Sequence, residues 1–454
     1  MKDLTKGNIT KNLFIYAIPA ILATLLSRTY STVDSIMVGK ILGETGLAAI
    51  GSTTSFMTAL SALLWGMGTG ISLYIGYLIS ANKKEQAVRA IKSNLLFLMI
   101  ISLIVMILAI VFCRPIFSLL YINDEIYNDA LTYYVIIMTC KCFSTFNSCV
   151  NDIFFITGNS SHAMKTSIVN CVINICLNYL FMAVFKWGVF GAAIATFISL
   201  LIVFIYNVFA IKKLYVGLTS VKQPIKLYKE EIVSAFKLAI PCMLQQGIMY
   251  VASAVVQPVA NRLGNSAIAA FSVCTTLYNI CTIFFFSASK GLMAFGSQCY
   301  SSGKIQLIKR GFLTSLGLAI SFTAPIVILM LIFPNLVAFC FLQDAVGQTA
   351  EYIIRYITLC FPFLFLAILN NLFHNFFRSV LKPLLTTITS AVCSITYIAF
   401  SFALTPSLAM DGIYWSFIIS WASECIVCLI IFFSNVWKTQ RYKELEKTCK
   451  ANNH

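Results

Sequence analysis

Residues 42–49 read LGETGLAA, and residues 263–270 read LGNSAIAA. The two stretches lie 221 positions apart, and Ala-Ile-Pro at 17–19 recurs at 239–241, an offset of 222. Further pairs keep the spacing of 221: Gly70 with Gly291, Lys83 with Lys304, and Arg89 with Arg310. Recurrence at a fixed offset indicates an internal repeat, so the chain consists of two duplicated halves.

Each half is too apolar for a water-soluble domain. Of the 454 residues, 59% are hydrophobic and 11% are charged, whereas average domains carry about 25% charged residues. The apolar runs are long and continuous, as spanning helices of ~20 residues require. An outer-membrane barrel would instead show ~10-residue segments of alternating hydropathy. The composition argues against a soluble enzyme, a disordered scaffold and a barrel.

Twelve spanning helices are predicted, six in each half. They cover residues 12–38, 47–80, 91–113, 129–157, 164–185, 189–212, 231–259, 266–298, 309–334, 349–377, 383–404 and 410–436. Six is an even number, so both halves have the same orientation in the membrane. The predicted fold class is an all-α polytopic membrane protein whose two six-helix lobes are related by a parallel pseudo-two-fold repeat, an arrangement typical of transporters. We assign 1–212 to the N-terminal lobe, 213–230 to a cytoplasmic linker, 231–436 to the C-terminal lobe and 437–454 to a basic cytoplasmic tail.

The basic residues predict the orientation of the chain. The N-terminus, the even-numbered connections and the C-terminus hold 24 Lys and Arg, and the opposite connections hold 4. Positively charged connections remain in the cytoplasm. We therefore expect a multi-pass protein of the cytoplasmic membrane with both termini inside, and this asymmetry explains the net charge of +16 without a nucleic-acid partner.

Charged residues inside the spans mark candidate sites, because a charge at bilayer depth costs at least about 2.5–3.5 kcal/mol. Asp34 stands out, since Arg28 is six residues away and the two do not share a helix face. Burial disfavours the charged form of an unpaired carboxylate, so we expect Asp34 to bind and release a proton; a structural hydrogen bond is the alternative. Other intramembrane charges, with a substrate-binding or structural role, are Arg28, Lys141, Asp152, Lys290 and Glu424.

Two further patterns complete the set. Asn170, Asn174 and Asn178 recur every four residues and share one helix face, where amides can hold a cation or a carboxylate or join helices; Thr196 on the next helix adds a hydroxyl. Lys290 and Glu424, opposite charges of the second half, are expected to interact because each would be costly alone. We find no Walker loop and no histidine at metal-ligand spacing, so no cofactor and no metal are expected.

Several of these segments together resemble the MATE (multidrug and toxic compound extrusion) transporters. The resemblance rests on IP at 18–19, VDSIMVG at 33–39, GLAAIG at 46–51, GAAIAT at 191–196 and the duplicated segments. It implies two six-helix lobes around a central cavity, and export of cationic, often aromatic compounds in exchange for H⁺ or Na⁺.

The resemblance also implies residue roles. Asp34 matches the family's first-helix carboxylate, Asn174 an Asn of the fifth helix and Thr196 a Thr of the sixth. The Asp that follows four residues later in members with an N-lobe cation site is replaced by Asn178, which removes a charge and favours H⁺ over Na⁺. The seventh-helix Glu of NorM-type members falls at Met249, so the chain looks closer to the DinF-type or a divergent bacterial branch.

The sequence thus predicts a monomeric antiporter that exports drugs or toxic cations through the lipid membrane in exchange for H⁺, with Na⁺ as the less favoured ion. A lipid-linked saccharide flippase of the same superfamily stays open, because Arg28, Lys141 and Lys290 would suit a cationic cavity. A polytopic membrane enzyme would need a clustered catalytic set near one interface, and none is visible. A channel suits the duplicated halves less well than alternating access does.

Overall fold

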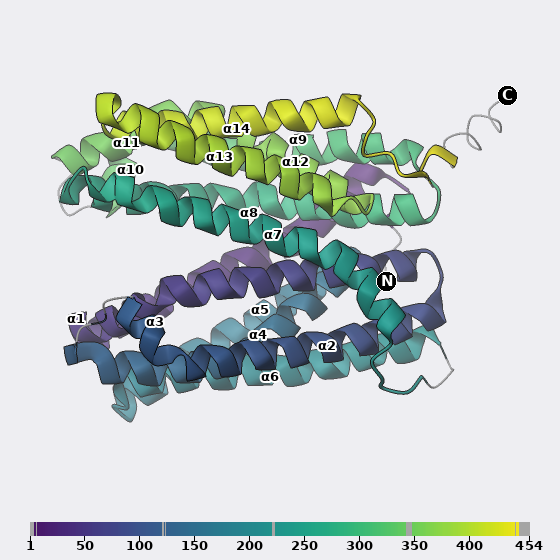
Figure 1. The fold of residues 1–454 in the computed structure, drawn as a ribbon, viewed down its shortest axis with the longest axis horizontal. Coiled ribbons are helices and arrows are strands. Elements are labelled where there is room, and N and C mark those ends of the chain that lie inside the picture. The colour runs from purple at the N-terminus through teal and green to yellow at the C-terminus, as the bar shows by residue number, and fades with distance from the viewer. Residues whose placement is uncertain are drawn as a thin grey trace. The chain divides into compact units, whose positions relative to one another are not determined.

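The computed structural model describes residues 4–5, 7–119, 122, 124–219, 223–341, 347–440 and 442–444. This part of the chain is helical almost throughout and contains no strand, which confirms the all-α fold class. The helices of each half run side by side as bundles (Figure 1). Asp344 of one expected external connection, and most of the basic tail beyond residue 440, lie outside the described residues.

The first half contains six helices at the positions of the predicted spans. α1 (Ile9–Ser80) covers two of them, because Gly43 adopts a non-helical backbone with φ +72° between its two parts. The others are α2 (Lys84–Val111), α4 (Asp124–Ile156), α5 (Ser160–Asn178) with a π-helical extension over Tyr179–Val184, and α6 (Gly188–Leu218). A short helix that the sequence did not predict, α3 (Cys113–Leu119), precedes α4.

The second half repeats this pattern. Its helices are α7 (Lys229–Asn261), α8 (Asn265–Ser301), α9 (Gln306–Ile332), α10 (Pro334–Phe341), α11 (Gln348–Cys360), α12 (Leu364–Ser379), α13 (Pro383–Leu408) and α14 (Met410–Phe433). The predicted span 349–377 is divided into α11 and α12 by a 3₁₀ turn at Phe361–Phe363, where Pro362 cannot donate a helical hydrogen bond. Gly264, the counterpart of Gly43, has φ +96°, so the duplicated stretches end their preceding helices in the same way.

Eleven helices in the described part of the chain are long and apolar enough to span a membrane. α4, at the predicted span 129–157, is not among these eleven, although its 33 residues are sufficient in length. Its polar residues include Lys141 and Asp152.

The chain forms two compact units whose borders fall inside helices. Unit 1 comprises residues 1–2 and 22–243, and unit 2 comprises residues 3–21 and 244–454. The start of α1 thus belongs to unit 2 and the start of α7 to unit 1, which differs from the lobe borders drawn from the linker.

Repeat-related glycines explain this exchange of helix starts. Within unit 1, a Cβ added to Gly70 would lie 2.2 Å from Cα of Ala239, at the start of α7. Within unit 2, a Cβ at Gly291 would lie 3.4 Å from the ring of Tyr16, at the start of α1. The small residue permits a close approach between helix backbones, and in both units the approaching helix comes from the other half of the sequence.

Candidate functional site

Asp34 lies at the end of a chain of side-chain hydrogen bonds in unit 1. Asn178 Nδ2 donates to Asp34 Oδ1 at 2.5 Å and to Asn174 Oδ1 at 3.0 Å. Asn174 Nδ2 donates to Thr196 Oγ1 at 3.3 Å. Both asparagines are fully buried. The structure therefore brings together the four residues that the sequence assigned to cation or proton coupling.

Thr196, at the opposite end of these hydrogen bonds from Asp34, fixes the donor and the acceptor of each. Thr196 uses its only hydrogen to donate to the backbone oxygen of Ala192, at 3.2 Å, so its oxygen must accept from Asn174. Each amide then has one orientation, and Asn178 must present N–H to Asp34. The amide chain thus supports the carboxylate form of Asp34, while the surrounding helices, which leave it only partly accessible, oppose that charge.

Further polar groups surround the carboxylate. Tyr30 on α1 hydrogen-bonds to Asn170, and the rings of Tyr30 and Tyr133 lie close enough to Asp34 to interact electrostatically with it. The buried oxygens Asn170 Oδ1 and Asn178 Oδ1 have no hydrogen-bond partner. A buried acceptor without a hydrogen bond is costly, and a ligand that binds there would remove this cost. These two oxygens could therefore coordinate a hydronium ion or a monovalent cation.

The backbone changes its winding at this site. α5 ends at Asn178, and the chain continues as a π-helix over Tyr179–Val184. π-helical turns are rare and occur frequently at functional sites, because they redirect side chains within a continuous helix. Here the change of winding places Asn178 at the last α-helical position, beside Asp34.

The remaining intramembrane charges of unit 1 are distributed differently. Asp152 is buried and accepts a hydrogen bond from Thr69 Oγ1 at 3.2 Å, which favours a structural role. Arg28 is exposed. Lys141 on α4 is partly buried and forms no ion pair with any described residue, so it is a charge within a span whose function the fold alone does not explain.

Glu424 in unit 2 pairs with a residue that sequence reasoning missed. Its Oε1 lies 2.9 Å from Nε2 of His374 on α12, and both side chains are buried. The expected interaction of Glu424 with Lys290, directly or through water, stays a prediction, and the contact that the structure gives Glu424 is with the ring of His374. A signal was present in the sequence, since Asn370, His374 and Arg378 recur every four residues, as the three asparagines of α5 do.

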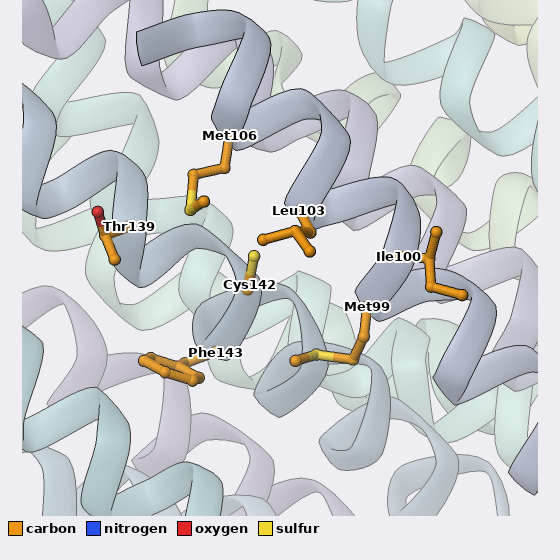
Figure 2. Close-up of a pocket in the computed structure, with 7 residues that line it drawn as sticks. All are labelled: Met99, Ile100, Leu103, Met106, Thr139, Cys142 and Phe143. Atoms are coloured by element: carbon orange, nitrogen blue, oxygen red, sulfur yellow. The ribbon is translucent and has the colours of Figure 1, made fainter.

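An apolar pocket of about 300 Å³ lies between α2 and α4 (Figure 2). Its lining is Met99, Ile100, Leu103, Met106, Thr139, Cys142 and Phe143. The methionines supply a deformable apolar surface. None of the predicted site residues lines this pocket, so the polar site around Asp34 is separate from it. In the described part of the chain no cluster of His, Cys, Asp and Glu could hold a metal ion.

Known proteins share both the sequence pattern and the fold. YoeA of Bacillus subtilis, described as a probable multidrug resistance protein, is 22% identical over 75% of each chain. A protein of Shewanella oneidensis described as an FAD transporter is 26% identical over 79% of this chain and 80% of its own length. The solved structure of an outward-facing multidrug resistance MATE family transporter superposes with a TM-score of 0.88, at 19% identity, over 96% of this chain and 98% of that one.

The match to the family follows the internal repeat. Residues 19–180 and 241–403 each match the MatE family, so one match falls in each duplicated half and together they cover most of the chain. The members are transporters, not enzymes, and multi-pass membrane proteins. This chain, with its duplicated six-helix halves and its first-helix carboxylate, belongs to the MatE family of membrane transporters.

Proposed function

We propose that this chain is a multidrug efflux antiporter of the cell membrane, which exports cationic or aromatic small molecules in exchange for H⁺. The observation that carries the proposal is the Asp34 carboxylate, held within a span by a chain of amides whose direction is fixed. The names of multidrug resistance relatives support the substrate class. We further propose that the protein acts as a monomer with both termini in the cytoplasm.

Proton binding at Asp34 would act through its hydrogen bonds. The carboxylate attracts Asn178 through a charge-assisted bond, which is about twice as strong as a neutral one. A proton on Asp34 removes that charge and weakens the attachment of α1 to α5. Two arrangements of unit 1 would then differ in proton affinity, and a substrate that prefers one arrangement is coupled to the proton by reciprocity.

H⁺ is favoured over Na⁺ because, among the described side chains of this site, Asp34 supplies one carboxylate and the others are amides and hydroxyls. Na⁺ would have to be held by Asp34 together with amide and hydroxyl oxygens, of which Asn178 Oδ1 is unpaired. These neutral oxygens compensate less of the dehydration of the ion than a second carboxylate would. A proton needs only one oxygen.

Everted membrane vesicles test this proposal. Efflux of ethidium or a fluoroquinolone should follow an imposed proton gradient at constant Na⁺ and should persist without Na⁺. Vesicles with Asp34→Asn, and vesicles lacking the protein, are the matched controls. Export that follows a Na⁺ gradient at fixed pH, with no response to the proton gradient, contradicts the choice of ion.

A second candidate substrate class is organic anions. It is favoured by Lys141, a charge within α4 that forms no ion pair in the described part of the chain, and by the relative described as an FAD transporter. A lipid-linked saccharide, the substrate of the flippase alternative, is also an organic anion. Uptake of FAD into the same vesicles, lost in Lys141→Gln but retained in Asp152→Asn, would select this candidate over export of cations.

A further inference from the structure

The buried polar side chains of unit 2 form a second network, centred on His374. Gln245 on α7 lies between Arg378 and His374, and its Nε2 is 3.2 Å from His374 Nδ1. His374 Nε2 is 3.1 Å from Thr389 Oγ1 and 2.9 Å from Glu424 Oε1. The residues come from four helices, α7, α12, α13 and α14, and none of them takes part in the site around Asp34.

The protonation state of His374 follows from its neighbours. Arg378 donates to Gln245 Oε1, and a guanidinium has no acceptor. The amide nitrogen of Gln245 must therefore face His374, and Nδ1 of the ring must accept. A second proton on Nδ1 would oppose this N–H group, so the ring is held neutral with its single proton on Nε2.

That single proton is shared between two acceptors. Thr389 donates its own hydrogen to the backbone oxygen of Thr386, at 3.1 Å, so its hydroxyl oxygen competes with Glu424 for His374 Nε2–H. Glu424 Oε1 consequently has no hydrogen bond of acceptable geometry, although it is only 2.9 Å from the ring nitrogen. A buried carboxylate oxygen is left with incomplete compensation of its charge.

In the part of the chain that the structure describes, the other titratable groups that interact electrostatically with Glu424 carry no positive charge. They are Cys393 on α13, which hydrogen-bonds to Glu424, Cys425 and Cys428 on α14, and Tyr278 on α8. Arg378 contacts Gln245 and forms no ion pair with Glu424. The charge of an ionised Glu424 is thus faced by a neutral ring, thiols and a phenol, and burial makes such a charge costly.

We propose that Glu424 is a second proton-binding site of this protein, and that Gln245 and Arg378 position His374 as its neutral hydrogen-bond donor. The proton adds to Oε1 and makes the carboxyl neutral, and no other bond forms or breaks. Proton binding at Glu424 is independent of the proposed function; its use in export rests on that function.

Proton binding is measured on the purified full-length protein in lipid nanodiscs, without substrate. Infrared difference spectra between acidic and alkaline pH report the carbonyl band of protonated buried carboxyls. Asp34→Asn should leave one such band, and Glu424→Gln should remove it. Glu351→Gln, at an exposed carboxyl of α11, is the matched control and should change neither band. A spectrum unchanged by Glu424→Gln overturns the site while leaving the proposal for Asp34 intact.

The positioning role is tested by ¹⁵N NMR of the histidine rings, with the His374 signal assigned from its loss in His374→Gln. Wild-type His374 should show an unprotonated Nδ1 and a protonated Nε2 throughout the pH range in which the Glu424 band titrates. Gln245→Glu replaces the donor with an acceptor, so His374 should gain a proton on Nδ1 and Glu424 should bind its proton only at lower pH. A doubly protonated His374 ring in the wild type overturns the proposal, including in the case that Glu424→Gln fails to fold.

Discussion

At the scale of single residues, the proposed coupling site consists of one carboxylate and three neutral side chains whose hydrogen bonds run in one direction. Asp34 has no cationic partner in the described structure, and its contact is the amide of Asn178. The network therefore distinguishes the charged from the neutral form of Asp34 through one strong hydrogen bond. Substitutions that fix either form should leave the fold intact and change the coupling.

Asp34→Asn is expected to lower the rate of proton-driven export by about tenfold or more. Coupling free energies of about 1–3 kcal/mol correspond to factors of about 5–150. Asn mimics the protonated carboxyl, so the protein should insert and express normally. Uptake of the substrate into everted vesicles under a proton gradient provides the measurement. Asp152→Asn is the control and should be milder, since Asp152 is held by Thr69. Native rates in the Asp34 variant would refute the mechanism.

Asn178→Asp is expected to introduce sensitivity to Na⁺. The substitution places a second carboxylate beside Asp34 and leaves the oxygens of Asn174 and Thr196 in reach, which favours a hard cation. The measurement compares export with and without Na⁺ at fixed pH. Asn128→Asp serves as the matched control, because Asn128 is exposed on α4 and outside the site around Asp34. Equal behaviour of the two variants would show that position 178 has no special role.

At the scale of elements, glycines determine where helices of the two halves meet. Gly70 on α1 lies against Ala239 of α7, and backbone atoms of Ala239 and Leu238 fill the space that a Cβ would need. Helix backbones cannot yield as a flexible side chain can. The contact occurs where both partners are small.

Gly70→Ala should destabilise the protein by about 1–3 kcal/mol, the usual cost of an overpacked contact. Thermal unfolding in detergent, followed by tryptophan fluorescence, should show a lower Tm. Gly217→Ala on α6 is the control, because no atom lies within 4 Å of a Cβ added there and Ala favours a helix. A Tm in Gly70→Ala equal to that of the control would mean that α1 and α7 are not in close contact.

At the scale of the whole molecule, the charge asymmetry of the connections predicts how the chain lies in the membrane. The prediction places Lys83 and Lys304 in the cytoplasm; Lys83 is exposed, in the turn between α1 and α2. Because both positions follow the second helix of their half, a parallel repeat requires them to be on the same side.

Lys83→Cys and Lys304→Cys should resist a membrane-impermeant maleimide in intact cells and react after permeabilisation. Glu351→Cys, near the start of α11, belongs to an opposite connection and should react from outside. Labelling is measured relative to the unsubstituted chain, which has its own cysteines. Reaction at position 83 in intact cells would show that the orientation is reversed.

The sequence by itself determined the features that depend on local composition. The length of the apolar runs predicted the spans, the offset of 221 predicted the duplication, and the spacing of Asn174 and Asn178 placed both amides on one face. The same spacing was present at His374 and Arg378, but it could not show which residue each would contact. Hydropathy shows which residues lie in a span, but it does not show how each helix is rotated against its neighbours.

Tertiary packing decided the pairs. His374 contacts Glu424, because the rotation of α12 and α14 about their axes is fixed by side chains that interdigitate along their whole length. Packing also assigned the start of α1 to unit 2 and the start of α7 to unit 1. The start of α1 follows the hydropathy pattern of any spanning helix, and contacts with residues far along the chain, such as Tyr16 against Gly291 and Phe14 against Phe322, place it in unit 2.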